Sequence, residues 1–178
     1  YGLVGSEMCI RDSPKTTNEW FIPGVSPIKI STVHRAIPID KRSGKRACFH
    51  DPATSSLEVF EFWPSDLLLI FRQAGVARRT PPAYASDCGL DQQGGGGTAP
   101  KIGSPSEVIT YTLRADRLSE ERIAFEAVAD ADVRRLFWFV DNRLVGEARP
   151  TEVFFWPAVS GDFAVSVLDD HGRAAVVN

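Results

Sequence analysis

Residues 136–146 read LFWFVDNRLVG. The first five, residues 136–140, are all apolar, which is typical of a strand that is buried on both faces at the centre of a sheet. Asp141 and Asn142 follow, and both residue types tolerate the left-handed backbone of a tight turn. Residues 144–146 then return as the partner strand. This stretch therefore predicts a β-hairpin that contains a central strand of a sheet.

Further short strands are predicted on both sides of this hairpin, and turns separate them at spacings of roughly 8–15 residues. The predicted strands cover residues 108–113, 123–127, 153–156, 163–167 and 174–177. Residues 116–122 are interpreted as a loop with at most one helical turn, and residues 169–172 as a turn. This pattern predicts an immunoglobulin-like antiparallel β-sandwich over residues 101–178.

The preceding segment, residues 14–83, predicts a small α+β arrangement of short strands and one helix. Isoleucines alternate with polar or small residues at residues 28–30 and 37–39, and residues 57–63 read LEVFEFW, so all three stretches predict strands. A helix is expected after Pro64, with Ser65 as its cap and Gly75 as its end. Its apolar face consists of Leu67, Ile70, Phe71 and Ala74.

Residues 84–100 are interpreted as a linker, because four successive glycines, residues 94–97, would hold a packed element only at a large entropic cost. The run lacks the lysine and hydroxyl residue that complete a phosphate-binding loop. Residues 1–13, YGLVGSEMCIRDS, have no clear helix or strand period. We interpret them as a non-native leader, with a frayed native N-terminus as the alternative.

Composition excludes several classes of protein. The chain has 178 residues, 43% apolar and 24% charged, and a formal net charge of −3. A charge this small and mixed does not favour nucleic acid or a membrane surface. No stretch approaches the roughly 20 apolar residues of a membrane span, and no secretory signal pattern is present.

The chain has three cysteines, Cys9, Cys48 and Cys88. Setting aside residues 1–13 leaves an even pair, which suits a disulfide between Cys48 and Cys88 in an exported protein. Two unrelated thiols are the alternative.

No catalytic, cofactor or metal site is predicted. His34, His50 and His171 are not at metal-ligand spacing with one another or with a cysteine. His50 is followed by Asp51, but we expect a surface histidine there, and we expect His171 to be solvated in a turn. Residues 26–29, SPIK, formally match a Ser-x-x-Lys nucleophile motif. Pro27 and the strand-like alternation argue against that role.

Paired carboxylates and aromatic side chains are the remaining candidates for chemistry. Acidic pairs capable in principle of glycoside hydrolysis are Glu58 with Glu61, Glu120 with Glu121, and Asp169 with Asp170. We expect all three pairs to be solvated. The aromatic residues fall mostly in predicted strands, so we expect them in the core, with a sugar-binding platform as the alternative. The tryptophans are Trp20, Trp63, Trp138 and Trp156.

Several ordered blocks of this chain resemble one protein family. Residues 18–28, NEWFIPGVSPI, and residues 59–68, VFEFWPSDLL, are similar to segments that follow the transpeptidase domain in bifunctional penicillin-binding proteins of the 1C type. Residues 136–146 and residues 169–173, DDHGR, are similar to the C-terminal β-sandwich domain of that family. The resemblance extends from about residue 14 to residue 178.

The resemblance implies a role in the bacterial cell wall. Members of the family resemble membrane-anchored synthases that polymerise and cross-link peptidoglycan, with active sites upstream of this segment. No catalytic residue is therefore carried over to this chain, and no cofactor is expected. The resemblance implies a non-catalytic accessory module on the periplasmic side of the inner membrane, anchored through an upstream segment. We expect it to dock a periplasmic protein, with peptidoglycan as the alternative ligand.

Overall fold

The computed structural model describes residues 32–89, 97–117 and 120–178. The chain divides into two compact units, one formed by Tyr1–Phe62 with Arg78–Gln92 and the other by Trp63–Ala77 with Gln93–Asn178. The expected leader 1–13, Trp20, the residue 26–29 motif and the strand expected at residues 28–30 lie outside the described residues. The segment limits expected from the sequence remain predictions.

The first unit is a two-stranded antiparallel sheet with a small apolar core. Strands β1 (His34–Asp40) and β2 (Ser55–Glu61) pair with Pro38 opposite Leu57. Both strands confirm the alternation read from the sequence. Among the described residues of this unit, one cluster of buried apolar side chains is formed by Ile37, Ile39, Phe60 and Phe62.

Arg46 and a disulfide attach a second segment to this sheet. The Arg46 backbone N–H donates to Ala83 O at 3.0 Å, and its carbonyl accepts from Ala85 N at 2.9 Å. Its guanidinium carbon lies 4.3 Å from the centre of the Tyr84 ring. Close by, the sulfur atoms of Cys48 and Cys88 are 2.04 Å apart, as a disulfide bond requires. This is the pairing suggested by the even cysteine count.

Asp40 organises the turn that follows β1. Its Oδ1 atom accepts hydrogen bonds from Ser43 Oγ at 2.7 Å, Ser43 N at 2.6 Å and Arg42 N at 3.1 Å. The hydrogen bond from the Ser43 side chain, followed by that from its backbone, holds the pKa of Asp40 below its ordinary value. The carboxylate form therefore stabilises the turn.

We expect Asp40→Asn to make the first unit less sensitive to acid. A group whose pKa is lower in the folded state contributes stability above its unfolded pKa, near 3.8, and loses it as the pH falls through the folded value. Thermal unfolding measured between about pH 5 and pH 2 should therefore show a shallower loss for Asp40→Asn than for the original chain. Asp87→Asn, which alters an exposed carboxylate of the same unit, is the control. An equal slope for all three chains would contradict this role of Asp40.

The second unit contains the helix α2 (Ser65–Gln73), which ends before Gly75 at φ +69° as expected. Its start differs from the prediction, because Pro64 occupies the capping position and no side chain caps the helix. Ser65 is instead buried as the first helical residue. Its Oγ accepts from Ala129 N at 3.1 Å, and its own N–H donates to Ala129 O at 2.8 Å. These two bonds attach α2, expected with the preceding segment, to the second unit.

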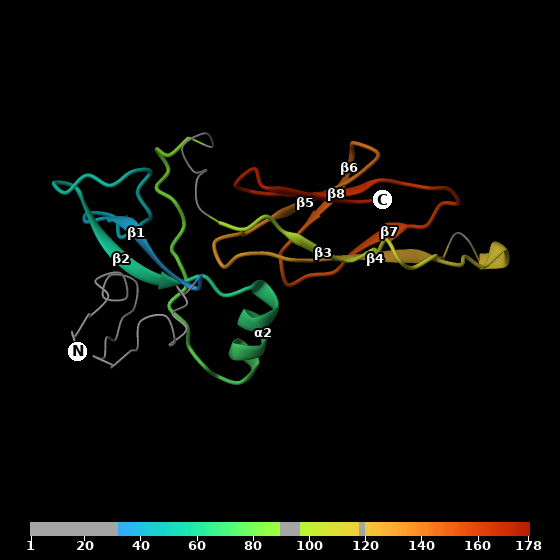
Figure 1. The fold of residues 1–178 in the computed structure, drawn as a ribbon, viewed down its shortest axis with the longest axis horizontal. Helices are drawn as coiled ribbons and strands as arrows, with labels where there is room; N and C mark the ends of the chain where they lie inside the picture. Colours follow the sequence, from blue (N-terminus) through green and yellow to red (C-terminus); the bar gives the residue numbers. More distant parts are fainter. Residues whose placement is uncertain (1–31, 90–96, 118–119) are drawn as a thin grey trace, which may run out of the picture. The chain divides into compact units, whose positions relative to one another are not determined.

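Two antiparallel sheets make up the rest of this unit. One has the strand order β3 (Lys101–Ser104), β4 (Arg122–Val128), β7 (Phe154–Pro157). The other has the order β6 (Arg143–Ala148), β5 (Leu136–Val140), β8 (Val165–Asp169), β9 (Ala174–Val177). Figure 1 shows the two sheets as stacked layers. The short 3-10 helix η1 (Ala115–Arg117) follows β3 and precedes β4 in the chain.

Aromatic and branched side chains fill the space between these sheets. Phe125 on β4, Trp138 and Leu136 on β5, and Val167 on β8 are each at most 1% exposed. The Phe125 and Trp138 ring centroids are 5.2 Å apart. The mainly β fold and the sandwich are therefore confirmed, and the immunoglobulin-like type remains a prediction.

The opening hairpin has the predicted form. Strand β5 lies between β6 and β8, and its side chains alternate between buried and half-buried. Asp141 and Asn142 form the turn, with φ values of 47° and 64°. The turn is joined to the start of β8, because Asp141 Oδ1 accepts from Ala164 N at 3.0 Å.

The strand predicted at residues 108–113 is wrong, since the structure pairs residues 101–104 with β4 instead. Ser106 begins a turn, in which Ile109 N donates to Ser106 O at 3.2 Å. The chain then leaves the sheet, so residues 108–113 have no strand partner among the described residues. Their alternating composition alone does not provide one.

Candidate functional site

The two ends of the sandwich differ in chemistry. Strand β8 carries Val165 at one end and Asp169 at the other. Near Asp169 lies a network of buried charges, whereas near Val165 lies an apolar cavity. We call these the polar end and the open end.

Asp169 is the centre of the polar end. Its side chain is fully buried, and its Oδ1 accepts from the backbone N–H groups of His171 and Arg173, both at 2.9 Å. Its Oδ2 accepts from Arg173 Nε at 2.6 Å. A buried carboxylate requires such compensation, because its desolvation alone costs several kcal/mol.

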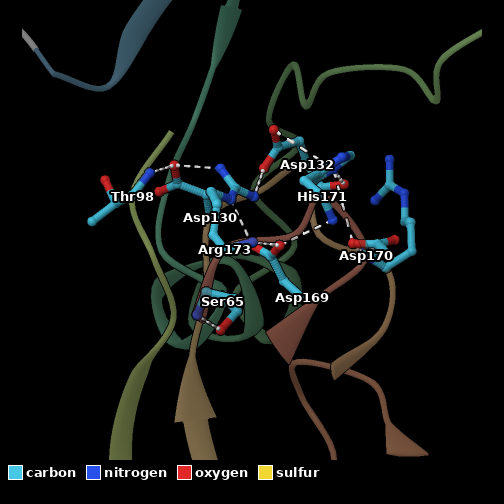
Figure 2. A network of polar contacts seen from close by, with 10 residues as sticks. Ser65, Thr98, Asp130, Asp132, Asp169, Asp170, His171 and Arg173 are labelled. Atoms are coloured by element: carbon cyan, nitrogen blue, oxygen red, sulfur yellow. Dashed lines mark hydrogen bonds and ion pairs between the residues drawn. The ribbon is translucent and has the colours of Figure 1, made fainter. Parts of the chain in front are cut away.

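Arg173 joins three carboxylates. Besides Asp169, its Nη2 donates to Asp132 Oδ1 at 3.0 Å, and its Nη1 lies 3.7 Å from Asp130 Oδ2 (Figure 2). Burial by itself would lower the pKa of Arg173, but the charge of Asp132 and the hydrogen bonds to Asp132 and Asp169 outweigh it and raise the pKa. The guanidinium therefore keeps its charge.

Gly97 lies against this guanidinium. Thr98 N donates to Asp130 Oδ2 at 2.8 Å, which fixes the start of the segment that leads into β3. A Cβ atom on Gly97 would lie 1.7 Å from Arg173 Nη1, and the φ of Gly97 is +148°. The glycine is therefore required by both the close approach and the backbone conformation.

We expect Gly97→Ala to destabilise the second unit by about 1–3 kcal/mol, because Arg173 would have to move away from its carboxylates. Gly172→Ala is the comparison, since a Cβ there meets nothing within 4 Å although φ is +82°. Urea unfolding followed by tryptophan fluorescence would measure both. A smaller loss for Gly97→Ala than for Gly172→Ala would contradict the close-approach argument.

The expectation that His171 and Asp169 are solvated is wrong, because both side chains are largely buried. The His171 side chain is only 9% exposed, and its Nε2 lies 3.2 Å from Asp132 O. The turn folds back on the loop after β4, where Arg134 N donates to Asp170 Oδ2 at 3.1 Å. Asp169 and His171 are largely buried because this turn packs against residues 132–134. The sequence of residues 169–172 alone does not indicate that contact.

The polar end is best explained as a structural element. Its carboxylates accept hydrogen bonds from Arg173 or from backbone N–H groups, as expected of a buried charge network that stabilises the fold. Among the described residues, no group of three or more His, Cys, Asp or Glu side chains is arranged to hold a metal ion.

The open end contains a cavity of about 580 Å³. Its floor is the end of the core, where Phe125, Trp156 and Phe163 meet. The Phe125 and Trp156 centroids are 5.9 Å apart at 25°, and those of Trp156 and Phe163 are 5.2 Å apart at 71°. Trp156 therefore packs against two other aromatic rings, those of Phe125 and Phe163.

Two loops form the walls of this cavity. One is the segment that leaves β3, where Tyr111 Oη accepts from Ser106 N at 3.2 Å. The other follows β7. Each loop presents an exposed apolar side chain, Ile109 at 56% and Val159 at 53%. Such uncovered apolar surface is typical of a binding site.

The rim of the cavity is acidic. Glu107 and Asp162 are exposed there, and among the described residues no lysine, arginine or histidine lines the cavity. Within the described ranges, neither carboxylate has an ion pair or hydrogen bond. The open end therefore combines apolar walls with two carboxylates that have no counter-ion in the described part of the chain.

The structure does not bring the other sequence candidates together. In the first unit, His50 Nδ1 lies 3.1 Å from Ser55 Oγ, and Glu58 pairs with Arg79. His34 lies on β1 and is half-buried. These side chains hold local turns and strands rather than a common site.

In the other acidic pairs proposed from the sequence, one or both carboxylates pair with an arginine instead of facing each other. Glu61 lies 3.8 Å from Arg78, and Glu121 lies 2.7 Å from Arg114. Glu120 is exposed. None of the three acidic pairs singled out from the sequence therefore faces a shared space in the part of the chain that the structure describes.

Sequence reasoning did not find the open end. Its residues come from four separate stretches, and only the exposed apolar residues next to Glu107 would have been a signal. Trp138 is buried in the core and Trp156 packs against it, as the core prediction expects, whereas Phe155 is 59% exposed and departs from it. Trp63 packs against Phe71 with centroids 5.3 Å apart.

The chain was compared with known proteins. The profile of the Penicillin-Binding Protein C-terminus Family matches residues 89–178, just over half of the chain. No curated protein and no solved structure matches this chain. Within the described residues, no helix has the length and apolar character that crossing a membrane requires.

Proposed function

Because the chain belongs to the penicillin-binding protein C-terminus family, we propose that it is a non-catalytic accessory module that docks a periplasmic protein onto a peptidoglycan synthase. The sandwich is the part that the family profile matches, and it contains the open end. The observation that carries the proposal is the distribution of apolar side chains. Phe125, Trp138 and Trp156 pack in the core, while Ile109 and Val159 remain uncovered on the walls of the open end.

The alternative is a peptidoglycan-binding module. Binding of sugar rings would require an aromatic ring with an uncovered face. Trp138 is buried and Trp156 contacts two other rings, so neither favours a sugar platform. Strand β9 is an edge strand of its sheet, and its Val176 is exposed, which supports association with a protein by strand addition.

The remaining parts of the proposal rest on the family. We propose the 1C type for the parent synthase, because the blocks at residues 18–28 and 59–68 resemble that type. We further propose a periplasmic location and a parent with glycosyltransferase and transpeptidase activities upstream. The coding sequence upstream of residue 14 would test this, since both domains should be found there.

Sedimentation with purified peptidoglycan tests the docking proposal. We expect the full chain to remain in the supernatant after centrifugation with insoluble peptidoglycan. Phe155→Ala and Tyr111→Ala, which remove exposed aromatic rings, should give the same distribution. Co-sedimentation that either variant abolishes would overturn the proposal in favour of glycan binding.

A further inference from the structure

The open end has a size suited to side chains rather than to a folded domain. Its volume of about 580 Å³ falls within the range of about 300–1,000 Å³ that is usual for ligand pockets. Because the floor consists of Phe125, Trp156 and Phe163, the interior accepts apolar groups. A protein partner would therefore insert a short segment rather than pack a flat face.

The charge at the rim indicates a cation. Several carboxylates of the same unit lie in ion pairs, among them Glu147 with Arg135 and Glu152 with Arg149. Glu107 and Asp162 have no such partner within the described residues, and no basic residue lines the cavity. A positively charged side chain is the complement of this rim.

One wall of the cavity, residues 108–113, indicates that the bound segment of the partner is extended. Residues 108–113, VITYTL, have the composition of a strand but no strand partner among the described residues. Residues 110–113 form no backbone–backbone hydrogen bond with any residue that the structure describes. The N–H and C=O groups of these residues are therefore available to hydrogen-bond the backbone of a bound segment.

We infer that the open end binds an extended segment of a partner protein in which a lysine or arginine lies between apolar residues. The apolar side chains enter the cavity, and the cation lies between Glu107 and Asp162. The backbone of the segment pairs with residues 110–113. This inference rests on the proposed docking function and specifies the chemistry of the partner.

The test uses the full chain and three fluorescent pentapeptides. The first is Val-Lys-Val-Thr-Val-amide with the fluorophore joined to its N-terminus, and the other two carry Gln or Glu in place of Lys. Fluorescence anisotropy at low salt should show the Lys peptide binding about 3- to 10-fold more tightly than the Gln peptide, and the Glu peptide more weakly than both. Added salt should reduce the difference.

Variants that remove rim charges test whether Glu107 and Asp162 cause the preference for the Lys peptide. The double variant E107Q/D162N should bind the Lys and Gln peptides equally. E126Q, which alters an exposed carboxylate of β4 away from the cavity, should keep the preference for Lys. Both replace exposed groups, so circular dichroism should show an unchanged fold.

Equal binding of the Lys and Gln peptides by the original chain would overturn the inference. So would a preference for Lys that E107Q/D162N retains, or no binding of any peptide. These failures leave the docking function intact as long as the chain does not sediment with peptidoglycan. Co-sedimentation that Phe155→Ala or Tyr111→Ala abolishes would instead remove the proposed function itself.

Discussion

Replacing Arg173 by alanine is expected to lower the free energy of unfolding of the second unit by about 3–5 kcal/mol. The variant would leave the buried carboxylate of Asp169 without its partner at 2.6 Å. Asp132, whose side chain is 5% exposed, would lose its partner at 3.0 Å as well. Removing one member of a buried ion pair costs far more than the pair contributes, because the remaining charge stays desolvated.

Two further variants define the cause of this loss. Arg149→Ala removes an exposed ion pair with Glu152 and should cost about 0–1 kcal/mol. Arg173→Lys keeps the charge but not the planar fork, so its loss should be intermediate. Urea unfolding followed by tryptophan fluorescence measures all three. A loss for Arg173→Ala no larger than that for Arg149→Ala would contradict the assigned role of the buried network.

Removing the disulfide with Cys48→Ser and Cys88→Ser is expected to destabilise the first unit by about 3–4 kcal/mol. The bond joins positions 40 residues apart, so it restricts a long loop in the unfolded chain. The apolar cluster of the described part of this unit is small, with four side chains, and small cores commonly rely on a disulfide for stability. The bond therefore contributes a large share of the stability of this unit.

Hydrogen exchange of β1 and β2, measured by mass spectrometry with and without reductant, tests this expectation. Exchange should accelerate strongly in the double variant and in the reduced original chain. Cys9→Ser is the matched control and should exchange like the original chain. Unchanged protection of β1 and β2 after reduction would show that the disulfide does not stabilise the unit.

The elements that sequence reasoning predicted correctly are those encoded by neighbouring residues. The apolar run at residues 136–140 and the turn residues Asp141 and Asn142 specify the central hairpin locally. The alternation in β1 and β2 likewise reflects a sheet with one buried face. In these places local pattern and tertiary structure agree.

The features that were missed depend on contacts between distant residues. Arg173 meets Asp132 across 41 positions of the sequence, and nothing near either residue indicates the pairing. Ser65 was expected as a cap because its type suits that position, but a tertiary contact with Ala129 determines its role. The segment 108–113 has strand composition, but a strand also needs a neighbour.

The open end illustrates the same limit for function. Glu107 and Asp162 are 55 positions apart, so their common rim is visible only after folding. The family match identifies the kind of module without assigning a partner to it. The partner is therefore best addressed by an experiment at this end of the sandwich.

Site-specific photo-crosslinking in the intact parent synthase is the most direct measurement. A benzoylphenylalanine placed at Val159, on the wall of the open end, is expected to form one defined protein adduct in cells, identified by its cross-linked peptide. The same group at the exposed position Glu147 on β6 should form none. No protein adduct at Val159, or equal adducts at both positions, would contradict the account that the open end docks a protein.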